Sequence, residues 1–137
     1  MVASRFFDEV EQDGICSVGA LLKINDEHIF SHQLNCGHGT NTKAELLTLL
    51  CLVKFVIVLG IDTLHIFGVL LVIVNWKKKI WPLQVISLEQ WCYNLVINHI
   101  YREHNKAADS LSKEALSTVV SILLCKESIE GTQVEKG

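Results

Sequence analysis

The first third of the chain alternates short apolar segments with polar turns. The apolar segments are residues 4–10 (SRFFDEV), 15–24 (ICSVGALLKI) and 28–34 (HIFSHQL), and EQDG and NDE separate them. Segments of this length between polar turns are typical of strands. We therefore expect an antiparallel meander of three strands, followed by a loop over residues 35–41.

Residues 42–60 carry the strongest helical pattern in the chain. Apolar side chains recur there with the spacing of one helix face, at Leu46, Leu47, Leu50, Cys51 and Val53. The segment begins with Thr42 and Glu45 in a capping-box arrangement and ends at Gly60. Both ends match the usual start and stop signals of helices, so we expect one continuous helix.

The remaining segments predict alternating strands and helices. Residues 62–68 and 96–102 have strand character, residues 69–76 are expected to form a short buried helix, and residues 83–95 and 105–117 have helical length and pattern. The order β-β-β-α-β-α-α-β-α is typical of an α/β domain. We expect a mixed five-stranded sheet, three antiparallel strands and then parallel ones, flanked by helices.

One domain accounts for most of the chain. At 137 residues the length suits a single hydrophobic core, which we place over residues 4–117. Residues 118–137 begin apolar and end charged, so we expect a C-terminal tail whose last dozen residues are disordered.

Charge and cysteine content narrow the possible partners and surroundings. The net charge is -3, so nucleic-acid binding would need a local basic patch. The five cysteines are an odd number without a CxxC pair, which favours reduced thiols in an intracellular protein of the cytoplasm or nucleus.

The sequence disfavours both a membrane segment and a zinc site. Residues 55–76 are largely apolar, but Asp62 and His65 interrupt them, and an acid near the bilayer centre costs about 3 kcal/mol. A membrane association is therefore the weaker alternative. A zinc site formed by His28, His32, Cys36 and His38 is also disfavoured, because strand positions spread ligands along a face. We expect these four to be solvated strand and loop residues.

Two motifs carry a family resemblance. The segments GTNTKAELL and HIYREHNKAADSLS stand in order, with His99 ten residues before Asp109, while Asp8 ends the first expected strand and Phe67-Gly68 closes the fourth. Over residues 4–116 the chain resembles type 1 ribonuclease H domains, most closely the plant retroelement-derived group. The resemblance also suggests that the chain is part of a longer retroelement polyprotein.

The resemblance implies an enzyme that cuts the RNA strand of RNA–DNA hybrids with two Mg²⁺ (or Mn²⁺) ions. It makes Asp8, Glu45 and Asp109 metal ligands, and places His99 near the second metal. Carboxylates from separate segments are what hard divalent ions need in such chemistry. Taken alone, each acid also has an ordinary structural interpretation, as a helix-start or strand-end residue.

The fourth ligand of the family is missing. Where the family has Gly-Asp-Ser, this chain has Gly68, Val69 and Leu70, and Asp62 lies roughly 20 Å away along a strand. Glu9 also replaces a Gly that the family favours after the first acid, which puts an anion where a nucleic-acid backbone would approach. We therefore expect impaired or absent hydrolysis, with a non-catalytic nucleic-acid-binding or interaction module as the alternative.

Nucleic-acid contacts are expected from a few polar and basic residues. Three lysines lie between two tryptophans in NWKKKIWP, and such groups can contact phosphates with aromatic rings beneath them. A lysine turn is also commonly just a solvated surface. The expected contact residues are Asn41, Lys77, Lys78, Lys79, Arg102 and Asn105.

Overall fold

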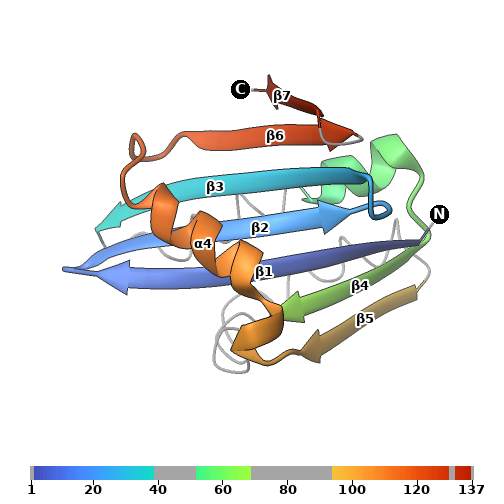
Figure 1. Cartoon of the computed structure of the whole chain (residues 1–137), viewed down its shortest axis with the longest axis horizontal. Coiled ribbons are helices and arrows are strands. Elements are labelled where there is room, and N and C mark those ends of the chain that lie inside the picture. The colour runs from blue at the N-terminus through green and yellow to red at the C-terminus, as the bar shows by residue number, and fades with distance from the viewer. Residues whose placement is uncertain (1, 39–51, 69–93, 130–131, 137) are drawn as a thin grey trace.

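The computed structural model describes residues 2–38, 52–68, 94–129 and 132–136. Within these ranges seven strands form one sheet in the order β5-β4-β1-β2-β3-β6-β7 (Figure 1). The strands are β1 (Val2–Gln12), β2 (Ile15–Lys23), β3 (His28–His38), β4 (Thr63–Gly68), β5 (Asn94–His99), β6 (Leu123–Ile129) and β7 (Thr132–Lys136). Helical segments are residues 52–59, the 3-10 helix η1 (Arg102–His104) and α4 (Lys106–Ala115).

The sheet confirms the expected mixed topology. Strands β1, β2 and β3 pair antiparallel as a meander, while β4 runs parallel to β1 and β5 runs parallel to β4. Antiparallel neighbours follow from tight turns, and parallel neighbours require crossover connections. The central position of β1, between β2 and β4, places its end where both kinds of pairing meet.

The third strand is longer than the sequence predicted. Residues 35–38, expected in a loop, continue β3 and pair with the start of β2, down to Ile15 opposite His38. The side-chain amide of Asn35 donates to the carbonyls of Leu116 (3.1 Å) and Thr118 (3.3 Å). The polar, Gly-containing sequence suggested a loop because these hydrogen-bonding partners, which are distant in the same chain, cannot be recognised from the segment itself.

The tail also differs from the expectation. Instead of ending in disorder, it forms β6, antiparallel to β3, and β7, antiparallel to β6, so the described residues form a sheet of seven strands and not five. The outer edge of β3 offers unpaired backbone groups, and β6 satisfies them. His28 on β3 and Glu127 on β6 also meet at 2.8 Å. The charged residues that suggested disorder are therefore strand residues in the structure.

The predicted long helix is visible in its second half. Residues 52–59 are helical and end at Gly60, whose φ of +66° is the left-handed conformation that glycine supplies at helix ends. Its predicted start, with Thr42 and Glu45, lies outside the described residues, as do the helices expected over residues 69–76 and in most of 83–95. The last two residues of that latter segment, 94 and 95, belong to β5. No helix in the described parts of the chain is long and apolar enough to cross a membrane.

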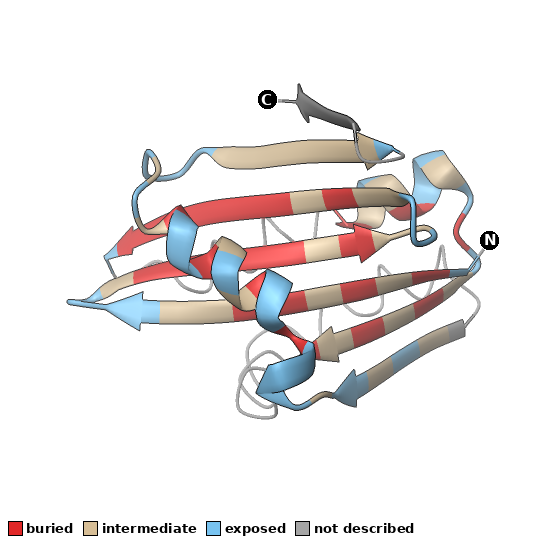
Figure 2. Cartoon of the chain, in the orientation of Figure 1, coloured by how far each residue is buried: buried red, intermediate tan, exposed pale blue. Residues whose placement is uncertain are grey.

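The main core packs between the sheet and residues 52–59. Figure 2 shows in red the buried residues along the central strands. The buried members of the core are Ala3, Phe7, Ala20, Leu22, Phe30, Leu52, Val56, Ile61, Leu64 and Ile66. His32 lies on the same face of the sheet as this core, is 1% exposed, and accepts a 2.7 Å hydrogen bond from Arg5 on its Nδ1. Burial and the Arg5 charge lower the pKa of His32 to about 2. The expectation of solvated residues was therefore wrong for His32, and also for Cys36, which is 3% exposed.

Helix α4 lies across the opposite face, over β1, β2 and β3 (Figure 1). Its backbone touches the sheet at Gly19: a Cβ there would lie 2.3 Å from Ser112 N and 2.6 Å from Ala108 O. Side chains from the sheet then bond the helix carbonyls, because the Ser17 hydroxyl donates to Ser112 O and Gln33 Nε2 donates to Leu111 O at 3.0 Å. The absence of a side chain at residue 19 lets α4 approach this closely.

We expect Gly19→Ala to destabilise the fold by about 3 kcal/mol, because the new methyl group meets helix backbone that cannot rotate away. Gly60→Ala is the matched control, since a Cβ there meets nothing within 4 Å and only the left-handed backbone is penalised, by about 1 kcal/mol. Urea unfolding of the two variants measures the difference. Equal losses would show that α4 does not depend on close contact at Gly19.

Candidate active site

The contact at Gly19 brings two aspartates together. Asp8 on β1 lies directly opposite Gly19 on β2, and Asp109 is in the first turn of α4, which rests on Gly19. A hydrogen bond joins the start of the helix to β1, because Asn105 Nδ2 donates to Phe7 O at 3.0 Å. Residues 101 positions apart in sequence therefore form one acidic pair.

The two carboxyl groups are not equivalent. Asp8 is 1% exposed, and its pKa is raised to about 6. Burial is the largest cause, the backbone N–H of Glu9 opposes it, and the nearby Asp109 adds to it. Asp109 is ion-paired to Lys113 at 2.9 Å, and that contact lowers its pKa. Arg102 lowers the pKa of both acids by its charge. A proton shared by this pair resides on Asp8.

The acid pair suits a divalent cation. Oδ1 of Asp8 accepts the Glu9 N–H at 2.9 Å, while its buried Oδ2 has no hydrogen-bonding partner among the described residues. Carboxylate oxygens are the ligands that Mg²⁺ and Mn²⁺ prefer. No group of three or more acidic, His or Cys residues forms a metal site among the described residues. Glu45, the third expected ligand, lies outside them.

The fourth ligand that the resemblance expects would follow β4, the strand beside β1 and Asp8. The parallel register of β1 and β4 ends with Phe7 opposite Gly68, one residue before Asp8 in one strand and one before Val69 in the other. Val69 itself lies outside the described residues. The register shows that β4 ends beside the acidic pair, and the resemblance assigns the lost carboxylate to the next residue, Val69.

The other predicted site residues divide into three groups. His99 ends β5 opposite Gly68 and is exposed, with its ring 5.8 Å from that of Tyr101. Arg102 is exposed on η1, close enough for its charge to act on both aspartates. Asn105 is only 2% exposed, and its hydrogen bond to Phe7 O holds the start of α4 against β1. The sequence did not indicate this contact. Asn41, Lys77, Lys78 and Lys79 lie outside the described residues.

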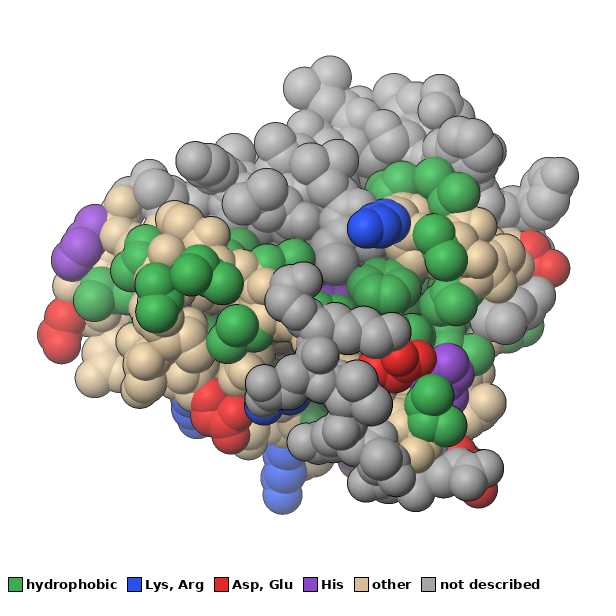
Figure 3. All heavy atoms as spheres, turned by 90° about the horizontal axis from the view of Figure 1, so that it is seen from above, with side chains coloured by type: hydrophobic (Ala, Val, Ile, Leu, Met, Phe, Trp, Pro, Cys, Tyr) green, Lys and Arg blue, Asp and Glu red, His purple; other side chains and the backbone are tan. Residues whose placement is uncertain are grey.

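Two further residues shape the site without having been predicted. Lys113 binds Asp109 across one helical turn, and the i,i+4 spacing of this acid and base was a visible signal. Gly19 had no such signal, because its importance depends on α4 crossing β2 at that point. On the face seen from above, the described residues show few Lys and Arg side chains (Figure 3).

A meander joined to two parallel strands, with a helix that carries an aspartate to the central strand, is the arrangement of ribonuclease H-like domains. Residues 7–115 match the reverse transcriptase-like family, which places Asp8 and Asp109 inside the matched region, and the chain belongs to this family. A comparison with curated proteins finds no match.

Solved structures show the same fold. RNase H1 from the archaeon Halobacterium salinarum superposes with a TM-score of 0.62 at 22% identity, covering 85% of this chain and 98% of that one. The N-terminal RNase H domain of a Mycobacterium tuberculosis protein gives 0.62 at 17% identity, covering 84% and 93%. LC11-RNase H1, isolated from compost by a metagenomic approach and solved in complex with an RNA/DNA hybrid, gives 0.56 at 18%, covering 84% and 95%.

The raised pKa of Asp8 predicts that Asp8→Asn stabilises the fold by an amount that depends on pH. Because the folded chain binds this proton more tightly than the unfolded chain, the protonated acid is fully accommodated below about pH 4, and stability falls as pH rises from there through 6. The variant should therefore gain on the order of 2 kcal/mol more at pH 7.5 than at pH 4.

Urea unfolding at the two pH values measures this gain. Asp26→Asn, which removes one negative charge from the exposed turn between β2 and β3, is the control for net charge. A gain from Asp8→Asn that is the same at both pH values would contradict a raised pKa at Asp8.

Proposed function

We propose that this domain binds RNA–DNA hybrids as a type 1 ribonuclease H does, and hydrolyses them slowly or not at all. The observation that carries the proposal is the meeting of Asp8 and Asp109 at the end of β4 in a ribonuclease H-like fold. The RNA/DNA hybrid bound to LC11-RNase H1, a protein of the same fold, supports the substrate class.

In this proposal Asp8, Asp109 and Glu45 hold a divalent cation, Mg²⁺ or Mn²⁺. When bound, the cation would activate water and neutralise charge on the phosphate. The chain's own contribution is the raised pKa of Asp8, because a proton competes with the cation for this carboxylate as the pH falls through about 6. Lys113 competes with the cation for Asp109.

The impairment follows from the residue after β4. Val69 offers no oxygen ligand, and its apolar side chain would have to border a strongly hydrated ion. Changes around a metal site already cost about 10-fold to 100-fold, so loss of a direct ligand should cost at least as much. Binding of the hybrid does not require all four carboxylates and is expected to survive this loss.

Contacts to the hybrid are proposed for exposed groups near the acidic pair. Arg102 lies close to both aspartates, and His99 ends the neighbouring β5. Arginine contacts to phosphate position a nucleic acid without reading its sequence. Asn41 and the three lysines at 77–79 complete the proposed set. The motifs support descent from a plant retroelement polyprotein and a location in the cytoplasm or nucleus.

Restoring the missing acid tests the proposal. With a labelled RNA–DNA hybrid and Mg²⁺ or Mn²⁺, the natural chain should bind in a salt-sensitive manner and cleave little, whereas Val69→Asp should raise cleavage by about tenfold or more. Val69→Asn is the matched control, because it adds a polar group of similar size without the charge. Adding Asp8→Asn to Val69→Asp should abolish the gain.

Two results would overturn the proposal. Robust cleavage by the natural chain, lost on Asp8→Asn, would show that the missing ligand does not impair hydrolysis. Failure of the natural chain to bind a hybrid at low salt would leave the fold without its proposed substrate, and would favour an interaction module.

A further inference from the structure

Helix α4 covers only part of its face of the sheet. Towards the start of β1 and across β4, no described helix packs on that face (Figures 1 and 2). The side chains there are only partly buried, although several are aromatic or apolar. We define the aromatic patch as Phe6, Leu21, Lys23, His65 and Phe67, which come from three neighbouring strands.

The rings of the patch are arranged in a row. Phe6 and Phe67 are register partners on β1 and β4, and their rings stack with centroids 5.1 Å apart and planes at 19°. The ring of His65 lies 6.3 Å from that of Phe67. On the other side Lys23 places its Nζ 5.4 Å from the centre of the Phe6 ring. A cation and three rings therefore span the sheet from β2 to β4.

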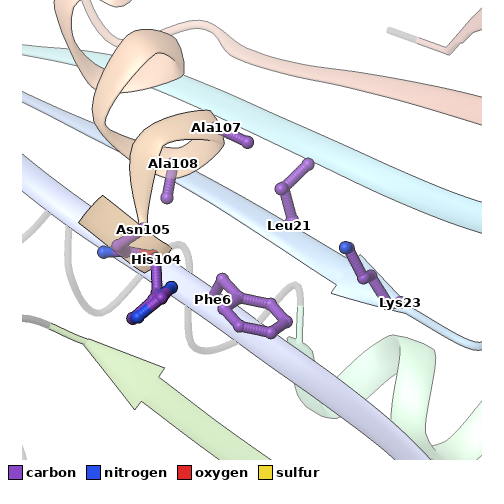
Figure 4. Close-up of a pocket in the computed structure, with 7 residues that line it drawn as sticks. All are labelled: Phe6, Leu21, Lys23, His104, Asn105, Ala107 and Ala108. Atoms are coloured by element: carbon purple, nitrogen blue, oxygen red, sulfur yellow. The ribbon is translucent and has the colours of Figure 1, made fainter. Parts of the chain in front are cut away.

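A shallow pocket of about 50 Å³ borders this row, between the start of α4 and strands β1 and β2. Its lining includes Phe6, Leu21, Lys23 and His104 (Figure 4). In that view Phe6 lies between Lys23 and His104, so nitrogen-bearing side chains flank the ring on both sides. The pocket joins the aromatic patch to η1, the segment that leads into α4.

The charge of this region differs from that of the whole chain. The net charge of the chain is -3, but side chains alternate between the two faces of each strand. On the face of the patch, β1 carries no acid before Asp8, and β2 carries none from Leu21 to Lys23. Strands β4 and β5 carry no acid on this face. The ionisable groups on these strand positions are Lys23 and His65. The region therefore suits a ligand that is anionic and carries flat rings.

We propose that the aromatic patch binds single-stranded nucleic acid, with bases packed on the Phe67 and His65 rings and phosphates contacted by Lys23 and His104. Stacking on aromatic side chains and contact with cations are how proteins hold unpaired bases regardless of sequence. A duplex keeps its base faces covered, so it cannot use this surface in the same way. Phe6 is two residues from Asp8 on the same face, about 7 Å along the strand, so a strand on the patch would lie near the acidic site.

Binding of a fluorescent 12-nucleotide oligouridine in EDTA tests the patch without any metal at the acidic site. We expect Phe67→Leu and Lys23→Gln each to weaken binding by about fivefold or more, because stacking and phosphate contact are lost separately. Lys54→Gln is the matched control, since it removes an exposed lysine from the helical residues 52–59.

Amide shifts from nuclear magnetic resonance provide a second measurement on the unmodified chain. Addition of oligouridine should shift the signals of Lys23, His65 and Phe67, whether or not the variants fold well. No binding, shifts confined to the acidic site, or equal binding of a duplex of the same length would overturn the proposal. So would dimerisation that Phe67→Leu abolishes, which would assign the patch to a second copy of the chain. The assay contains EDTA and no hybrid, so failure to bind oligouridine would not contradict the proposal on hybrid cleavage. Failure of hybrid binding or cleavage would likewise not contradict oligouridine binding at the patch.

Discussion

The close approach of α4 to β2 at Gly19 is the constraint on which the candidate site depends. A helix can rest directly on a sheet only where no side chain separates their backbones, and here the missing Cβ would lie 2.3 Å from Ser112 N. The hydroxyl of Ser17 and the amide of Gln33 then bond helix carbonyls. Because Gly19 is the register partner of Asp8, the same contact that anchors the helix also carries Asp109 to Asp8.

The acidic pair created in this way has an electrostatic cost that the chain partly offsets. Burial and the neighbouring carboxyl raise the pKa of Asp8, while Lys113 and Arg102 stabilise the charge of Asp109. A divalent cation would relieve the same repulsion more completely. If Val69 stands where a ligand is lost, as we propose, Lys113 and Arg102 become relatively more important for balancing this charge, and the fold is expected to persist while hydrolysis is weakened.

Much of this architecture could be predicted from local signals. Turns between apolar segments predicted the meander, and the cap at Gly60 predicted a helix end. Asp8 and Asp109 could be paired only through the family resemblance, because nothing local connects β1 to α4. The strand character of residues 35–38 and of β6 was missed, since it depends on cross-strand partners. The burial of Arg5 with His32 was missed for the same reason: polar residues on the core face are satisfied by partners distant in sequence.

The most direct test of the central claim, that Asp8 and Asp109 form one cation site, is a Mn²⁺ titration of the ¹⁵N-labelled chain. Paramagnetic broadening reports which amides lie near the bound ion. The account predicts that signals of Glu9 and of the first turn of α4 broaden together at the same Mn²⁺ concentration, and that Asp8→Asn removes both effects. Broadening at only one of the two segments, or broadening that survives Asp8→Asn, would contradict it.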